Sequence, residues 1–152
     1  MEVLHKLPDV HKTIETSGYS DAETFERVLW EMDYFIMDIK LMDDAQHRRY
    51  TGVSNKNILH NAQTLMKSGR PHRLRIPLIP GVNDTEENLD TFAQFVSSVN
   101  PHTPIELLPY HKTAGAKYDM VGMEYKPIFQ TDQKVCTHPE IFEKYGLEAA
   151  VL

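Results

Sequence analysis

The chain has 152 residues, of which 41% are hydrophobic and 25% are charged, as is ordinary for a soluble globular protein with one core. Its net charge of -6 argues against nucleic acids and anionic membranes as partners, and it has no apolar run long enough to span a bilayer. The single cysteine, Cys136, excludes an internal disulfide framework and a cluster or zinc site built from this chain's thiolates alone. We therefore expect one cytoplasmic domain over residues 1–152, with no signal peptide.

The first half of the chain alternates between predicted strands and helices. In chain order these are the end of a helix (1–6), a strand (13–16), a helix begun by a Ser20–Glu23 capping box, a strand (35–42), a short polar helix (from 43 or 44 to 50) and an amphipathic helix (58–66). Gly69 follows the last of these helices and is expected to stop it.

The second half continues the alternation. Its predicted elements are a strand (72–79), a helix capped by Asp84 and Glu87, a strand (105–109), an irregular stretch (112–134), a short helix begun by Thr137 and a final strand (147–152). Strands that alternate with helices in this way are expected to be parallel and joined by right-handed crossovers.

The strand at residues 35–42 carries an unusual pair of charges. Side chains alternate between the two faces of a strand, so Ile36, Asp38 and Lys40 share one face. The opposite face is uniformly apolar and is expected to lie under a helix layer: it holds Phe35, Met37, Ile39 and Leu41. Burying a carboxylate beside an ammonium is costly unless the two groups pair or meet a ligand, so this strand predicts a site at its carboxyl end.

The strand at residues 72–79 repeats this pattern, with Arg73 and Arg75 on one face and an apolar stripe on the other. The strand at 105–109 is apolar on both faces except for Glu106, as expected of a buried parallel strand. Charged groups on the inward face favour a barrel over a flat doubly wound sheet, because a barrel has an interior to receive them. We therefore predict an α/β fold with a partial TIM-like (β/α) barrel of parallel strands.

Five strings, in order and with matching spacing, resemble the glycyl-radical-enzyme activating enzymes of the radical S-adenosylmethionine (radical SAM) superfamily, of the pyruvate formate-lyase activating type. They are IETSGY (14–19), DIKLMD (38–43), HRRYTGVSNKNIL (47–59), LRIPLIPGVND (74–84) and ELLPYHKTAGAKY (106–118). The resemblance implies a partial TIM-like barrel, a four-iron four-sulfur cluster and S-adenosylmethionine as cofactors. It also implies a 5′-deoxyadenosyl radical that takes hydrogen from a glycine of a partner glycyl radical enzyme, and flavodoxin or ferredoxin as the reductant.

The chain departs from this family in one large respect. The CxxxCxxC cluster motif and the GGE motif of the family are absent from this sequence. Cys136 lies outside every matched string and does not replace them. We therefore expect a C-terminal portion of a radical SAM barrel that has lost the first strands, is inactive in isolation and exposes a sheet edge where those strands belong.

The resemblance assigns cofactor-binding roles to six residues. It makes Lys40, held by Asp38, the cation that meets the carboxylate or ribose of S-adenosylmethionine, and it matches Glu15 and Thr16 to a strand-end position that receives the methionyl amino group. Arg75 matches a strand-end cation that faces cofactor or substrate peptide, and His111 of LPYH matches a contact near the adenosine. The resemblance assigns no residue as a general acid or base and none as a metal ligand, because the radical chemistry belongs to the cofactor.

Simpler interpretations remain open for the same residues. Asp38 and Lys40 would also make a structural ion pair, Arg73 and Arg75 would also serve as solvated edge charges, and Glu15 would also cap a turn. Two other functions are possible: a barrel lyase with Lys40 as Schiff-base nucleophile, or a non-catalytic docking module. The neighbouring Asp38 argues against the lyase, because an anion favours the protonated amine.

Overall fold

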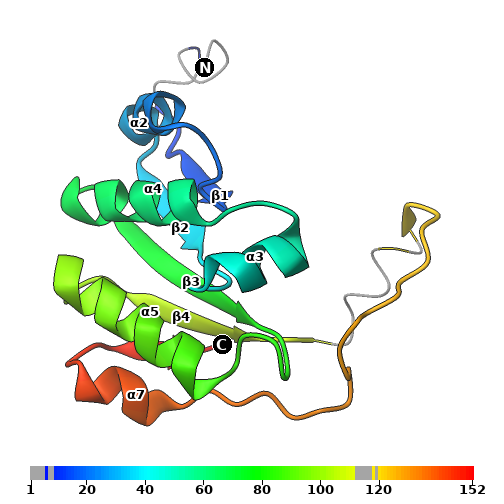
Figure 1. The fold of residues 1–152 in the computed structure, drawn as a ribbon. Helices are drawn as coiled ribbons and strands as arrows, with labels where there is room; N and C mark the ends of the chain where they lie inside the picture. Colours follow the sequence, from blue (N-terminus) through cyan, green and yellow to red (C-terminus); the bar gives the residue numbers. More distant parts are fainter. Residues whose placement is uncertain (1–5, 7–8, 112–117, 119) are drawn as a thin grey trace.

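The computed structural model describes residues 6, 9–111, 118 and 120–152, and its strands and helices alternate along the chain (Figure 1). The elements are β1 (Thr13–Thr16), α2 (Ala22–Glu31), β2 (Tyr34–Asp38), α3 (Asp44–Thr51), α4 (Lys56–Lys67), β3 (His72–Leu78), α5 (Glu86–Val99), β4 (Ile105–Pro109), α7 (Pro139–Lys144) and β5 (Ala149–Val151). The predicted helix end at 1–6 lies outside the described residues, apart from residue 6. None of the described helices is long and apolar enough to cross a membrane.

The five strands form one sheet in the order β1-β2-β3-β4-β5, and every neighbouring pair is parallel. This confirms the predicted parallel α/β fold. Each strand is followed in space by the next one in sequence, and the described helices lie along one face of the sheet (Figure 1). This sequential winding is the arrangement of a (β/α) barrel, whereas the strand order of a doubly wound sheet reverses at a switch point.

The core lies between the sheet and this helix layer. The predicted alternation in β2 and β3 is confirmed. The side chains on the apolar face of both strands, such as Phe35 of β2 and Leu78 of β3, are buried, whereas those on the charged face are only partly buried. The largest fully buried side chains are Phe35, Phe92, Phe142, Met37, Ile39, Leu65, Leu74, Ile76, Leu78, Leu89, Ile105 and Leu107. Two aromatic contacts, Phe25 with Phe35 and Phe92 with Phe142, join α2 to the sheet and α5 to α7.

Three predicted helix caps are wrong by one residue. The observed N-caps are Asp21, Thr85 and His138, in place of Ser20, Asp84 and Thr137. The reason is clearest at Asp84, whose carboxylate is used elsewhere in the fold. It accepts hydrogen bonds from the backbone N–H groups of Gly81 at 2.7 Å and Cys136 at 3.0 Å, so the hydroxyl of Thr85 is left to cap α5.

Buried asparagines secure the loops at the carboxyl edge of the sheet. Asn55, Asn61 and Asn83 are at most 2% exposed, and each side chain bonds to backbone atoms of a loop that follows a strand. Their partners are Gly18 and Ser20 for Asn61, Leu41 and Met42 for Asn55, and Lys40, Pro77 and Ile79 for Asn83. Loops held in this way have little freedom to move, so the edge is preorganised.

Asn83 is the best residue for testing how much these hydrogen bonds stabilise the fold. Its Nδ2 donates to the carbonyls of Lys40 at 2.7 Å and Pro77 at 2.8 Å, and its Oδ1 accepts from the N–H of Ile79 at 2.6 Å. We expect Asn83→Ala to lower the free energy of unfolding by about 2–4 kcal/mol, because buried backbone groups lose their partners. Urea denaturation measures this, with the exposed Asn57→Ala as control; equal stabilities in the two variants would contradict the prediction.

Candidate functional site

The face of the sheet opposite the helices carries charged side chains near the carboxyl edge. Asp38 is the last residue of β2, and Lys40 lies two residues beyond it in the loop. The ammonium Nζ of Lys40 lies 3.3 Å from Oδ2 of Asp38, and the two side chains are 39% and 18% exposed. The predicted pair is therefore formed, with the anion more deeply placed than the cation.

Asp38 is only half satisfied by this contact. Its second oxygen, Oδ1, is buried and has no hydrogen-bond partner among the described residues. Burial raises the pKa of the Asp38 carboxyl, and the nearby Lys40 offsets this only in part. A buried carboxylate oxygen without a partner is costly, so this atom is suited to receive a hydrogen-bond donor from a ligand.

A hollow of about 230 Å³ opens beside this pair. Its lining residues come from the loop after β1, the end of β2, α3 and the start of α4: Ser17, Tyr19, Asp38, Lys40, His47, Thr51, Val53 and Ile58. The hollow combines apolar walls with a carboxylate, an ammonium and an imidazole. Mostly apolar walls with a few convergent polar groups are typical of a small-molecule site.

Four more charged residues form a network on the same face. Arg75 directs Nε and Nη2 to Oε2 of Glu106, at 3.0 and 2.8 Å, and Nη1 to Oε1 of Glu15 at 3.0 Å. Arg73 pairs with the other oxygen of Glu106 and donates from Nε to the hydroxyl of Tyr34 at 2.8 Å. Burial acts to raise the pKa of Glu106, but the hydrogen bonds from Arg75 and Arg73 outweigh it, so the pKa is lowered overall.

The structure brings together most of the residues proposed from sequence. Arg75 lies opposite Asp38 in the register of β2 and β3 and contacts Glu15 across the sheet. Glu15, for which capping a turn was the alternative role, is 62% exposed and pairs through Oε1 with Arg75. Thr16 uses its hydroxyl to accept from the N–H of Gly18 at 3.0 Å, which shapes the turn after β1.

His111 is exposed and lies just beyond the end of β4, after Tyr110. The following residues 112–117 lie outside the described residues, so the end of the matched string ELLPYHKTAGAKY is described only in part.

Sequence reasoning missed three members of the site. Glu106 was noted only as an exception in an apolar strand, and Arg73 was given no cofactor-binding role, yet both belong to the ion network of Arg75. The available signal was Glu106 itself, because a carboxylate in a buried parallel strand requires a partner. His47 was also missed; it is 3% exposed and lines the hollow.

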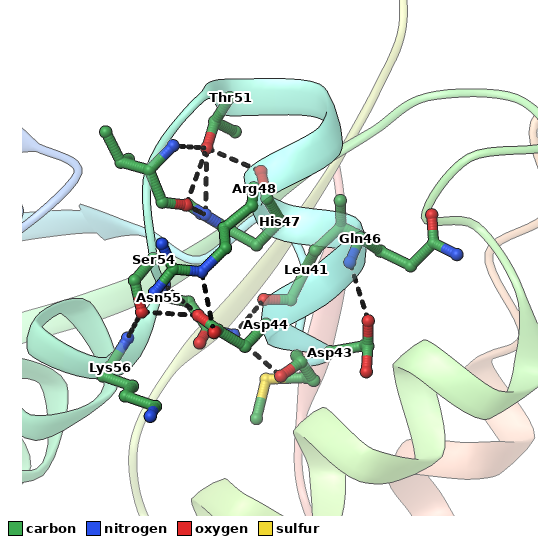
Figure 2. A network of polar contacts seen from close by, with 12 residues as sticks. Leu41, Asp43, Asp44, Gln46, His47, Arg48, Thr51, Ser54, Asn55 and Lys56 are labelled. Carbon is green, nitrogen blue, oxygen red and sulfur yellow. Dashed lines mark hydrogen bonds and ion pairs between the residues drawn. The ribbon is translucent and has the colours of Figure 1, made fainter.

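The connection from α3 to α4 is held by a second polar network, centred on Asp44 (Figure 2). Oδ1 of Asp44 accepts from the hydroxyl of Ser54 and from the N–H of Asn55 at 3.0 Å, and Oδ2 accepts from Nε of Arg48 at 3.0 Å. These bonds fix residues 51–55, which form one wall of the hollow. The matched string HRRYTGVSNKNIL thus builds a rigid loop beside the Asp38–Lys40 pair.

Among the described residues, no group of three or more His, Cys, Asp and Glu side chains is placed to hold a metal ion. The charged groups form ion pairs: Asp38 with Lys40, and Glu106 with Arg75 and Arg73. What the arrangement offers is charge complementarity and hydrogen bonds for binding and orienting a polar ligand at the carboxyl edge.

No model of a known protein family matches the chain. Similar curated proteins are the trans-4-hydroxy-L-proline dehydratase activating enzyme of Clostridioides difficile (40% identical over 123 residues, 80% of this chain and 40% of that protein) and the 4-hydroxyphenylacetate decarboxylase activating enzyme of Clostridium scatologenes (41% identical over 130 residues, 83% and 41%). The choline trimethylamine-lyase activating enzyme of Oleidesulfovibrio alaskensis is 35% identical over 123 residues, 79% of this chain and 40% of that protein. The chain therefore spans about two fifths of the length of these relatives.

A solved structure supports the same relationship. A domain of the pyruvate-formate lyase-activating enzyme of Bacteroides vulgatus matches with a TM-score of 0.75 and 28% identity, over 99% of this chain and 88% of that one. A radical SAM methyltransferase of Sphaerobacter thermophilus matches with a TM-score of 0.59 and 17% identity, over 92% of this chain and 39% of that one, which shows a shared fold.

The position of Glu106 between two arginines predicts a large effect of removing its charge. We expect Glu106→Gln to lower the free energy of unfolding by about 2–4 kcal/mol, because Arg73 and Arg75 lose their shared anion in a poorly solvated place. The control is Glu140→Gln, whose side chain is 67% exposed and whose loss should change stability by no more than about 0.5 kcal/mol. Chemical denaturation compares the two; a Glu106 variant as stable as the control would show that the network is dispensable.

Asp44 predicts a pH-dependent effect. Hydrogen bonds from Ser54 and Arg48 lower the pKa of the Asp44 carboxyl from 3.8 to about 2 in the folded protein. A group with a lowered folded pKa stabilises the fold above its unfolded pKa, and this stabilisation is lost as the pH falls through the folded value. We expect Asp44→Asn to lower Tm at neutral pH and the difference from wild type to shrink between about pH 4 and pH 2. A difference that stays constant over this range would contradict the assignment.

Proposed function

Because this chain is homologous to part of the glycyl-radical-enzyme activating enzymes of the radical SAM superfamily, we propose that it forms the S-adenosylmethionine-binding portion of such an enzyme. The proposed activity is the reductive cleavage of S-adenosylmethionine to a 5′-deoxyadenosyl radical and the abstraction of hydrogen from a glycine of a partner glycyl radical enzyme. The chain covers about two fifths of the length of its relatives, and the proposal makes this portion a cofactor-binding and substrate-facing part of that machinery.

The observation that carries the proposal is the Asp38–Lys40 pair beside the hollow. The ammonium of Lys40 is aligned by Asp38 at 3.3 Å and is suited to meet the carboxylate or ribose of S-adenosylmethionine. The buried Oδ1 of Asp38 supplies an acceptor that a ligand donor would satisfy. The residues present therefore fit the ligand, since Lys40 and Asp38, a cation and a carboxylate with one unpaired buried oxygen among the described residues, both line one small cavity.

The remaining cofactor-binding residues take supporting roles in this proposal. Glu15 and Thr16, at the end of β1, would receive the methionyl amino group, and His111 would lie near the adenosine. Arg75 would face the cofactor or the substrate peptide in an orientation fixed by Glu106. These groups bind and orient the ligand, and the walls of the barrel limit access of water to it.

The residues of this chain do not fit the four-iron four-sulfur cluster of the family. The cluster needs several cysteine thiolates, and the sequence has one cysteine, Cys136, which is exposed. We therefore assign no step of the reaction to cluster ligands of this chain. In the proposed function the 152-residue chain binds S-adenosylmethionine but does not cleave it alone, and the cluster and its flavodoxin or ferredoxin reductant act with the complete enzyme in the cytoplasm.

The proposed protein substrate is a glycyl radical enzyme of the pyruvate formate-lyase type. Support comes from the names of the relatives, which activate a trans-4-hydroxy-L-proline dehydratase, a 4-hydroxyphenylacetate decarboxylase and a choline trimethylamine-lyase. The structural neighbour activates pyruvate-formate lyase. All four activate a second enzyme, which is the feature carried over here.

The contact of Lys40 with Asp38 bears on the competing Schiff-base lyase. A lysine acts as an amine nucleophile when it is desolvated or beside another cation. Lys40 instead is 39% exposed and is paired with a carboxylate, so the observed environment favours an ion-pairing role.

Binding of S-adenosylmethionine tests the proposal directly. We expect isothermal titration calorimetry to show binding by the wild-type chain, and Lys40→Ala to weaken it about tenfold or more, because a charge-assisted contact is lost. The matched control is Lys144→Ala, which removes another lysine of an ion pair, with Asp90 at the surface, and should leave the affinity unchanged. No binding by the folded wild-type chain would overturn the proposal, and equal affinities of the two variants would remove Lys40 from the site.

A further inference from the structure

His47 on α3 lies at the hollow, and the proposed function assigns it no role. It is 3% exposed, and it lines the hollow together with Asp38 and Lys40. A buried histidine often has a purely structural role. The hydrogen bonds of His47 therefore decide whether one of its ring nitrogens remains available to a ligand.

The bonds of His47 fix its tautomer. Nδ1 lies 2.7 Å from the carbonyl oxygen of Val53, which only accepts, so Nδ1 must carry the proton. The nearby hydroxyl of Thr51, 2.9 Å from Nδ1, donates its own proton to the backbone carbonyl of His47 at 2.7 Å and so also acts as an acceptor toward the ring. In a neutral imidazole held this way, Nε2 is left with a lone pair and acts as an acceptor.

The surroundings of His47 hold the ring in place. Figure 2 shows His47 within α3 and Thr51 at the end of that helix, next to the network in which Asp44 anchors Ser54 and Asn55. Asn55 in turn donates to the carbonyls of Leu41 and Met42, so the loop that carries Val53 is held to the loop after β2. A group oriented this firmly loses little entropy on binding a ligand.

The composition of the hollow indicates which ligand group faces His47. A volume of about 230 Å³ is below the ~300–1,000 Å³ of sites that enclose a whole drug-sized ligand, so the hollow takes one part of a molecule. Lys40 serves an anionic part, and the carboxylate of Asp38 serves a cationic one. The neutral acceptor Nε2 complements a remaining N–H or O–H donor.

From this geometry we propose that His47 is a ligand-binding residue whose Nε2 accepts a hydrogen bond from an N–H or O–H group of S-adenosylmethionine bound beside Lys40. This inference rests on the proposed function, since it requires that ligand. It adds a residue from α3 to the site. It also gives the network around Asp44 a role in binding, because the network holds the Nδ1 edge of the ring and leaves the Nε2 edge for the ligand.

Two substitutions separate this role from that of a structural brace. In His47→Asn the short amide places a donor near the position of Nδ1, so it preserves the bond to Val53 and removes the acceptor at the Nε2 position. We expect this variant to keep the wild-type Tm within a few degrees and to bind S-adenosylmethionine about tenfold more weakly. The matched control is His60→Asn on the exposed face of α4, which should bind as wild type does.

The decisive experiment is ¹H–¹⁵N correlation NMR of the imidazole nitrogens in the 152-residue chain. Without ligand, His47 should show a protonated Nδ1 and a bare Nε2, and added S-adenosylmethionine should shift the Nε2 signal while that of exposed His102 stays fixed. Adenosine and L-methionine, added separately, tell which half of the ligand supplies the donor.

The outcomes are distinguishable. Binding with an unmoved Nε2 signal, or wild-type affinity in His47→Asn, would overturn the role of His47 and leave the proposed function standing. A folded wild-type chain that does not bind S-adenosylmethionine would overturn the proposed function and this inference with it.

Discussion

The two-residue alternation of β2 and β3 is the constraint on which both the core and the candidate site depend. In each strand one set of side chains is buried under the helices, while the next set points to the opposite face with its charges. Parallel pairing without a shift then places Asp38 beside Arg75, and Arg75 beside Glu106. A slip of one residue would bury these charges in the apolar core, so the register that stabilises the core also builds the site.

The charges on the helix-free face are tolerated because they are matched. Glu106 receives both arginines of β3, and Arg75 reaches on to Glu15, so this network holds two cations and two anions. Asp38 and Lys40 balance one another as well. Within this arrangement the buried Oδ1 of Asp38 has no hydrogen-bond partner in the described part of the chain, so a ligand donor would satisfy it.

Rigid loops turn this charged face into a small cavity. Buried asparagines hold the ends of the strands, and Asp44 fixes the connection from α3 to α4. These polar side chains form hydrogen bonds to the loop backbone and so restrict the loops to one conformation. A site built on such loops has its binding groups in position before the ligand arrives.

The sequence by itself determined the strands, their parallel arrangement, the apolar face of each one and the side on which Asp38, Lys40 and Arg75 lie, because alternation is a local property of the chain. It misplaced the caps of α2 and α5 by one residue, since neighbouring Ser, Thr and Asp side chains compete for the same N–H groups and only the fold decides between them. The tertiary structure alone decided that Glu106 joins Arg73 and Arg75, residues more than thirty positions away, and that His47 faces the same hollow as Lys40. These contacts cross between strands and helices, and their geometry depends on register and packing rather than on any local pattern.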